Sequence, residues 1–219
     1  MSETTALGLS TRTGAVMIAF TVVFTALMAF TEDATRERIA ASANDEKMKS
    51  IAEVLPPAAY DNALLDDFIL TGPTPALGLD DGGRIYRARK AGQPAALVLE
   101  AIAPDGYSGK VNLIVAVRAD GSLSGVRVTG HRETPGLGDY IDPKKDKNKA
   151  APWIVQFTDL NPASTPLDQW KVRKDGGQIA YHTGATISAR AVTNAVARAA
   201  RFAADNQNRL FAAPSGKPL

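Results

Sequence analysis

The residues whose types and spacing are best suited to chemistry lie near the C-terminal end, where positions 181–188 read Tyr-His-Thr-Gly-Ala-Thr-Ile-Ser. Gly184 permits a backbone conformation that residues with a side chain avoid. Residues 189–201 place small apolar side chains and arginines at helical spacing, which predicts a helix that starts at about Ser188. Thr186 would then lie on the turn that leads into the helix. A helix N-terminus offers free N–H groups and a positive dipole end, so a hydroxyl here would reach a bound phosphate.

A second interpretation of these hydroxyls is purely structural. Serine and threonine are among the residues most often found as N-caps, so Thr186 or Ser188 would accept a hydrogen bond from the first helical turn. From the residue types alone, capping is the more common role. The two interpretations are compatible, because both need a hydroxyl at the start of a helix.

Two further constellations contain residues suited to ligand binding. Residues 131–139 read His-Arg-Glu-Thr-Pro-Gly-Leu-Gly-Asp and follow a predicted strand that ends at Gly130. The Pro-Gly pair and the second glycine are typical of a tight turn with an exposed backbone. Residues 106–109, Gly-Tyr-Ser-Gly, precede another predicted strand that starts at Lys110.

Composition excludes several classes of function. The chain has 219 residues, a formal net charge of +2 and no cysteine. Thiolate-bound metals, iron–sulfur clusters and disulfides are therefore excluded, and the charge does not suggest a nucleic-acid partner. A haem or metal site would have to use His131 and His182, which are far apart and lack carboxylates at ligand spacing. No serine-hydrolase motif or triad spacing is present.

The N-terminal part predicts a membrane span. No charged residue lies between Arg12 and Glu32, and about 20 such apolar residues cross a hydrocarbon core. We expect an N-terminal tail at 1–12 and a transmembrane helix at 13–31. A cleaved signal peptide would need small residues in an Ala-x-Ala arrangement, which residues 26–30 do not supply.

The orientation of this span is less strongly specified by its flanking charges. Arg12 precedes it closely, whereas Arg36 and Arg38 follow it. By the positive-inside rule this count mildly favours a cytoplasmic C-terminal part.

We expect residues 32–57 to form a charged helix that Pro56-Pro57 ends. It would be either a stalk or the first helix of the domain that follows.

The remaining residues, 58–219, predict one α+β domain of antiparallel strands with packed helices. One hairpin pairs residues 84–89 with 94–101, and another pairs 110–117 with 123–129 across Asp-Gly. Val111, Leu113, Val115 and Val117 alternate, so one face of their strand is expected to face the core. The basic run 144–149 is either a solvated loop or a contact for another protein of a complex.

Residues 183–188 resemble the flavinylation motif Ser/Thr-Gly-Ala-Thr-x-Ser/Thr of bacterial redox-driven ion pumps. In that family the last threonine of Gly-Ala-Thr carries FMN through a phosphoester bond, which implies Thr186 here. Residues 131–138 and 106–109 resemble two other motifs of the same FMN-binding domain. Together with the N-terminal anchor, their order resembles the G subunit of the Rnf electron-transport complex. A related domain occurs in the C subunit of the sodium-pumping NADH:quinone oxidoreductase.

The resemblance implies a covalent FMN site without metal ligands or catalytic residues of its own. A threonine hydroxyl is a poor nucleophile, and no self-sufficient activating pair lies near Thr186 in sequence, so an external flavin transferase with FAD as donor is implied. The implied cofactor-binding residues are Thr186 as the attachment point, with Thr183, Gly184, Ala185, Ser188, Tyr107, Glu133, Thr134, Gly136, Leu137 and Gly138.

The implied function is a one-electron relay in a complex of the bacterial inner membrane, with a single-pass anchor and the domain in the periplasm. That complex couples electron flow between ferredoxin and NAD to ion translocation, and the other subunits are the implied partners. The chain alone would not be an enzyme, since it has no NAD fingerprint and no iron–sulfur ligands. The alternative is a non-catalytic assembly subunit with a vestigial flavin site, suggested by Ala180, where the family usually has Asp six residues before the modified threonine.

Overall fold

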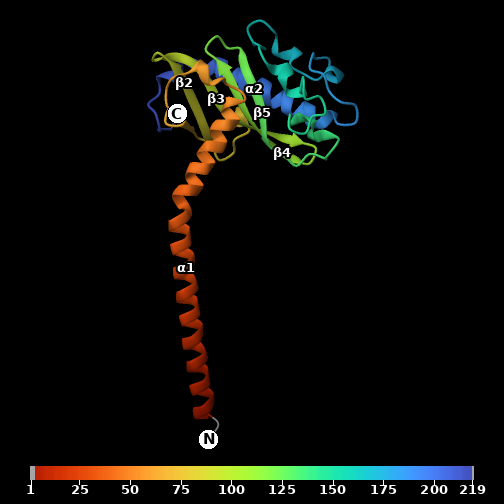
Figure 1. The fold of residues 1–219 in the computed structure, drawn as a ribbon. Helices are drawn as coiled ribbons and strands as arrows, with labels where there is room; N and C mark the ends of the chain where they lie inside the picture. The colour runs from red at the N-terminus through yellow and green to blue at the C-terminus, as the bar shows by residue number, and fades with distance from the viewer. Residues whose placement is uncertain (1–2, 219) are drawn as a thin grey trace. The chain divides into compact units, whose positions relative to one another are not determined.

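The computed structural model describes residues 3–218, which form two compact units, the first ending at Glu46 and the second beginning at Lys47 (Figure 1). Helix α1 (Glu3–Ala52) is continuous across this boundary. No proline lies within it to interrupt its backbone hydrogen bonds. The sequence-based boundaries at 1–12, 13–31, 32–57 and 58–219 stay predictions.

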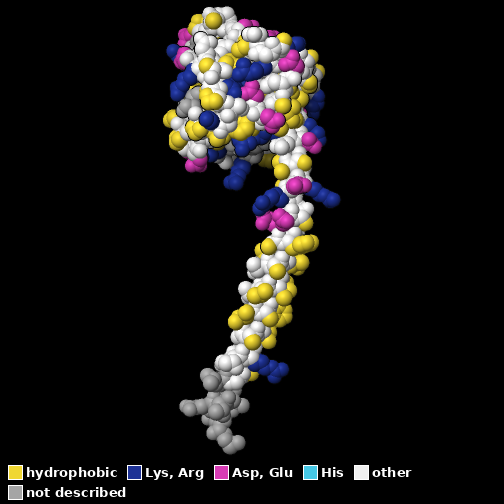
Figure 2. Space-filling model, turned by 90° about the vertical axis from the view of Figure 1, so that its left-hand side faces the viewer, with side chains coloured by type: hydrophobic (Ala, Val, Ile, Leu, Met, Phe, Trp, Pro, Cys, Tyr) yellow, Lys and Arg dark blue, Asp and Glu magenta, His cyan; other side chains and the backbone are white. Residues whose placement is uncertain are grey.

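In the part of the chain that the structure describes, α1 is the one helix that is long and apolar enough to cross a membrane. Its most apolar window of 18 residues has a mean hydropathy of 2.1, and none of that window is buried. Figure 2 shows hydrophobic side chains along this helix, with charged side chains beyond them. The hydroxyls of Thr21 and Thr31 donate to the carbonyls of Met17 and Leu27, at 2.9 and 2.8 Å. Their polar groups are therefore satisfied within the helix.

The second unit is built on an antiparallel sheet with the strand order β1-β2-β3-β4-β5. The strands are β1 (Phe68–Thr71), β2 (Gly83–Lys90), β3 (Gln93–Gly106), β4 (Gly109–Arg118) and β5 (Leu123–Gly130). The hairpins β2–β3 and β4–β5 confirm both predicted pairings. With helix α2 (Thr186–Ala212) packed on the sheet, the α+β prediction is confirmed.

Both faces of the sheet are covered. Helix α2 lies against β3 and β4 on one face (Figure 1), where the alternating β4 residues from Val111 to Val117 pack with Val192 and Val196. The predicted core face of β4 is therefore confirmed. The many alanines of α2 keep its side chains short, so the helix backbone lies close to the strands.

The opposite face is covered by the end of α1 and the residues just after it. Ile51, Val54 and Leu55 pack there with a cluster of buried side chains on the strands, which includes Tyr86, Val98 and Ile114. A Cβ atom on Gly125 would lie 3.0 Å from the Cα atom of Val54. Glycine at this position of β5 therefore lets the chain cross the sheet at close range.

A buried arginine connects the sheet to the C-terminal end of α2. The Arg87 side chain is only 3% exposed and pairs with the Asp67 carboxylate. Its guanidinium also donates to the carbonyl oxygens of Leu210, at 3.1 Å, and Ala213. The last carbonyls of a helix carry a partial negative charge, so a cation here satisfies them and offsets the helix dipole.

Replacing this cation should therefore destabilise the domain strongly. We expect Arg87→Met to lower the free energy of unfolding by about 3 kcal/mol, because Asp67 and the helix carbonyls would lose a charged partner in a buried setting. Urea denaturation of the full chain in detergent measures this loss. Lys110→Met is the matched control, since the Lys110–Asp80 pair is well exposed and should contribute less than about 1 kcal/mol. Equal losses in the two variants would contradict this assignment.

Candidate functional site

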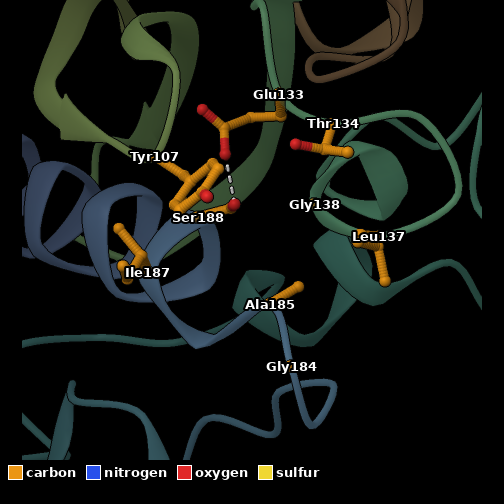
Figure 3. A pocket seen from close by; sticks show the side chains of 9 residues that line it. All are labelled: Tyr107, Glu133, Thr134, Leu137, Gly138, Gly184, Ala185, Ile187 and Ser188. Atoms are coloured by element: carbon orange, nitrogen blue, oxygen red, sulfur yellow. Dashed lines mark hydrogen bonds between the residues drawn. The ribbon is translucent and has the colours of Figure 1, made fainter.

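One cavity of about 210 Å³ is formed where three segments distant in sequence meet (Figure 3). The β3–β4 hairpin contributes Tyr107, the loop after β5 contributes residues from Glu133 to Gly138, and the start of α2 contributes residues from Gly184 to Ser188. The motifs singled out in the sequence thus converge on one place, although 55 positions separate Glu133 from Ser188.

The carboxylate of Glu133 connects these three segments. The Ser188 hydroxyl donates to its Oε2 atom, and the backbone N–H of Ser108 donates to Oε1 at 3.0 Å. Glu133 and Ser188 are 4% and 1% exposed. Since both donors are neutral, the buried carboxylate depends on these hydrogen bonds to replace those it would make with water.

Two glycines allow the segments to approach this carboxylate. A Cβ atom at Gly106 would lie 2.9 Å from Oε1 of Glu133, and a Cβ atom at Gly138 would lie 2.5 Å from the Ser188 hydroxyl oxygen. Any side chain at either position would push the segments apart. Gly136 has a different role: its φ of +75° favours glycine, but a Cβ atom there would have no neighbour within 4 Å.

The rim of the cavity is apolar and open. Tyr107, Leu137 and Ile187 are 67%, 55% and 44% exposed, which is unusual for large hydrophobic side chains that lie so close together. The cavity therefore combines a polar floor, where Glu133 and Ser188 lie, with an exposed apolar rim. This combination suits a flat, partly polar ligand.

Helix α2 begins at Thr186, two residues earlier than the sequence suggested, and its N-cap is Ala185. The capping interpretation of the two hydroxyls is therefore wrong. No side chain caps the helix, and the Ser188 hydroxyl is bonded to Glu133 instead. The sequence could not show this, because the partner of Ser188 lies in another motif. The N–H groups of the first turn consequently have no side-chain acceptor.

Eight of the eleven residues implied by the sequence motifs line the cavity: Tyr107, Glu133, Thr134, Leu137, Gly138, Gly184, Ala185 and Ser188. Thr186 is half-buried at the start of α2 without lining the cavity, and the exposed Thr183 and the turn residue Gly136 also lie outside it. Ile187 lines the cavity but was missed, because it occupies the variable position of its motif. Binding of a cofactor by these residues stays a prediction.

The two histidines lie in different surroundings. The Nδ1 atom of His131 accepts a hydrogen bond from the backbone N–H of Glu133 at 3.1 Å. The His182 ring stacks on the Tyr140 ring, with 3.9 Å between the ring centroids. Among the described residues, no three histidine, aspartate or glutamate side chains are grouped in a way that could hold a metal ion.

Known proteins match both parts of the chain. The FMN-binding domain family matches residues 106–201, and the family described as the RnfG N-terminal region matches residues 9–54. Relatives that bear the name of the G subunit of an ion-translocating oxidoreductase complex include one from Pseudomonas aeruginosa, 43% identical over 194 residues and 88% of each chain. Another, from Shewanella amazonensis, is 38% identical over 94% of this chain and 93% of its own. A third, from Vibrio cholerae, is 37% identical over 93% of this chain and 95% of its own.

The bond between Ser188 and Glu133 should contribute measurably to stability. We expect Ser188→Ala to lower the free energy of unfolding by about 1–3 kcal/mol, because the buried carboxylate loses one of its two donors. Thr183→Ala is the control, since Thr183 is exposed and its replacement should change stability by less than about 0.5 kcal/mol. Chemical denaturation of flavin-free protein measures both values. If Ser188→Ala were as stable as the control, Glu133 would not depend on this bond.

Proposed function

Since this chain belongs to the family of G subunits of ion-translocating oxidoreductase complexes, we propose that it is a membrane-anchored electron-transfer protein that carries FMN covalently bound to Thr186. Its FMN-binding domain covers the three segments that form the cavity. The observation that carries the proposal is the convergence of these segments beside an uncapped helix N-terminus at Thr186.

The residues around the cavity are compatible with a flavin. Tyr107, Leu137 and Ile187 offer apolar contact to an aromatic ring system, and Glu133 and Thr134 offer polar groups for its heteroatoms. Pockets that enclose whole ligands usually have volumes of about 300–1,000 Å³, and this cavity is smaller. A small, open cavity suits a ligand that is held by a covalent bond as well as by contacts.

The start of α2 is suited to the phosphate of such a ligand. Its first turn contains no acidic residue, and no side chain caps it. The free N–H groups and the positive end of the helix dipole would therefore stabilise a phosphodiester on Thr186. FMN supplies reversible uptake and release of electrons, while the protein holds the ring and tunes its potential through contacts.

A threonine hydroxyl is a poor nucleophile and needs a base or a metal ion to activate it. We propose a flavin transferase that uses FAD as donor. The Thr186 hydroxyl loses its proton to a base of the transferase, and its oxygen forms a bond to the phosphorus of the FMN half. The pyrophosphate bond of FAD breaks, and AMP leaves. The partly exposed position of Thr186 after an exposed turn fits this requirement for access.

The proposed membrane topology and the proposed role in electron transfer are based on the family to which the chain belongs. We propose that residues 13–31 of α1 span the bacterial inner membrane, with residues 1–12 in the cytoplasm, residues 32–57 as a stalk and the domain at 58–219 in the periplasm. There it would pass electrons between other subunits of a complex that couples ferredoxin and NAD to ion translocation. It would not be an enzyme on its own. The alternative of an assembly subunit with a vestigial flavin site rests on Ala180 alone, whereas all three motif segments line the cavity.

Covalent attachment is tested by the intact mass of the protein. We expect wild-type protein, produced with its transferase, to gain the mass of FMN less one water and to keep flavin fluorescence after denaturation. Thr186→Ala should lose both while folding normally, because it lacks the attacking oxygen. Thr158→Ala, which changes an exposed threonine outside the motif and the cavity, should keep both. A label found on Thr183 or Ser188 would overturn the assignment of Thr186.

Orientation is tested by cysteine labelling, which the absence of native cysteine makes unambiguous. Lys147→Cys lies on an exposed loop of the domain, and Ser10→Cys precedes the proposed span. With a periplasmic domain, an impermeant thiol reagent added to intact spheroplasts should label the first variant and not the second. The reverse pattern would place the domain in the cytoplasm, as the count of flanking basic residues suggests.

A further inference from the structure

Residues 182–185 form a tight turn directly before Thr186. The backbone N–H of Ala185 donates to the carbonyl of His182 at 3.1 Å, and Gly184 has a φ of +92°. Such a turn favours glycine at its third position. The turn itself is exposed at Thr183 and Gly184, so little else in its own sequence fixes its conformation.

The hydroxyl of Tyr140 bonds both ends of this turn. Tyr140 belongs to the short 3-10 helix η3 (Gly138–Ile141), which directly follows the cavity loop. Its hydroxyl accepts the backbone N–H of His182 at 3.2 Å and donates to the carbonyl of Ala185 at 3.3 Å. One side-chain oxygen therefore links the first and last residues of the turn through two hydrogen bonds.

The ring of Tyr140 is held in place by its surroundings. It is 4% exposed, stacks on the His182 ring and meets the Trp153 ring edge-on, with 5.5 Å between the centroids. Trp153, in the 3-10 helix η4 (Trp153–Phe157), also donates from Nε1 to the carbonyl of Ala180 at 2.6 Å. The segment from Ala180 to Ala185 is thus bound at its start by Trp153 and at its end by Tyr140.

The protonation state of Tyr140 supports this arrangement. Burial raises the pKa of Tyr140 above its ordinary value of 10.0. The phenol therefore keeps its proton at physiological pH and stays available as a donor to the Ala185 carbonyl. The bond that Tyr140 accepts from the His182 N–H does not need this proton, so only its donation to the Ala185 carbonyl depends on the protonated phenol.

The position of Thr186 depends on both of its neighbouring segments. On its C-terminal side, α2 is anchored by the fully buried Ala189 and Val192. On its N-terminal side lies the turn, whose ends are bonded to Tyr140. Loss of the Tyr140 hydroxyl would leave the helix packed in the core but would free the turn to change conformation.

We infer that Tyr140 is a positioning residue for flavin attachment, because its hydroxyl holds the turn in the conformation that presents the Thr186 oxygen to the transferase. This inference rests on the proposed attachment at Thr186. It assigns no contact with the flavin to Tyr140. A group transfer of this kind is sensitive to placement, since a displacement of about 1 Å at the reacting atom can reduce a rate by about a hundredfold.

The test uses full-length, flavin-free protein in detergent, incubated with the transferase and FAD, with attachment followed by intact mass. We expect Tyr140→Phe to reduce the maximal rate of attachment by at least about tenfold. Its thermal midpoint should stay close to that of wild type, because the ring and its stacking remain. Tyr181→Phe is the matched control: Tyr181 is partly buried in the same segment, and no hydrogen bond of its hydroxyl occurs within residues 3–218. It should react at the wild-type rate.

The kinetic parameters separate positioning from other roles. A lower kcat at unchanged KM supports positioning. An unchanged rate overturns the inference, and so does a raised KM alone, which would mean that Tyr140 contacts the transferase. If the wild-type chain takes up no flavin at Thr186, the proposed function fails first. If the wild-type chain is flavinylated at Thr186 and Tyr140→Phe reacts at the same rate, the proposed function stands and this inference fails.

A second measurement needs neither flavin nor the Tyr140→Phe variant. In Thr186→Ala protein, the backbone amide of His182 should exchange its hydrogen at least about tenfold more slowly than the amide of Gly184, because only the former is bonded to Tyr140. Exchange at equal rates would show that the bond does not persist in solution and would overturn the inference.

Discussion

The site depends on one buried carboxylate and its two neutral donors. Glu133 cannot lie in the interior without hydrogen bonds, and the two that it makes come from different segments of the chain. This requirement forces the β3–β4 hairpin, the loop after β5 and the start of α2 to meet. The glycines at 106 and 138 are a consequence, because no side chain fits beside that carboxylate. The cavity lies between these three segments, which the Glu133 side chain connects.

The framework that supports this arrangement could largely be predicted from the sequence. The β4–β5 turn at Asp120-Gly121 and the alternation along β4 identified strands because these signals are local. Strand β1 was missed because it has only four residues and is defined by its pairing with β2. Strand β3 extends beyond its predicted end through Pro104, which sequence rules assign to a loop and which lies where the pairing register shifts.

In the candidate site, too, local motifs could be predicted from the sequence, whereas contacts between distant residues could not. The motifs identified most of the residues that line the cavity, but they did not indicate which of them bond to one another. Capping was an alternative role for Thr186 or Ser188 because the partner of Ser188, Glu133, is distant in sequence. Tyr140 was not singled out at all, since nothing in its local sequence connects it with a turn 45 positions away. Relations of this kind depend on packing across the sheet and become visible only in three dimensions.

The absence of negative charge at the start of α2 has a consequence for the proposed attachment at Thr186. Its C-terminal carbonyls are matched by Arg87, whereas its first turn contains no negative charge. An anion at a helix start contributes about 0.3–1 kcal/mol, and up to about 2 kcal/mol where it is partly buried. A phosphodiester on Thr186 would thus complete the electrostatic pairing of the helix. A chain that carries the proposed phosphodiester would therefore open less readily at this end than a chain without it.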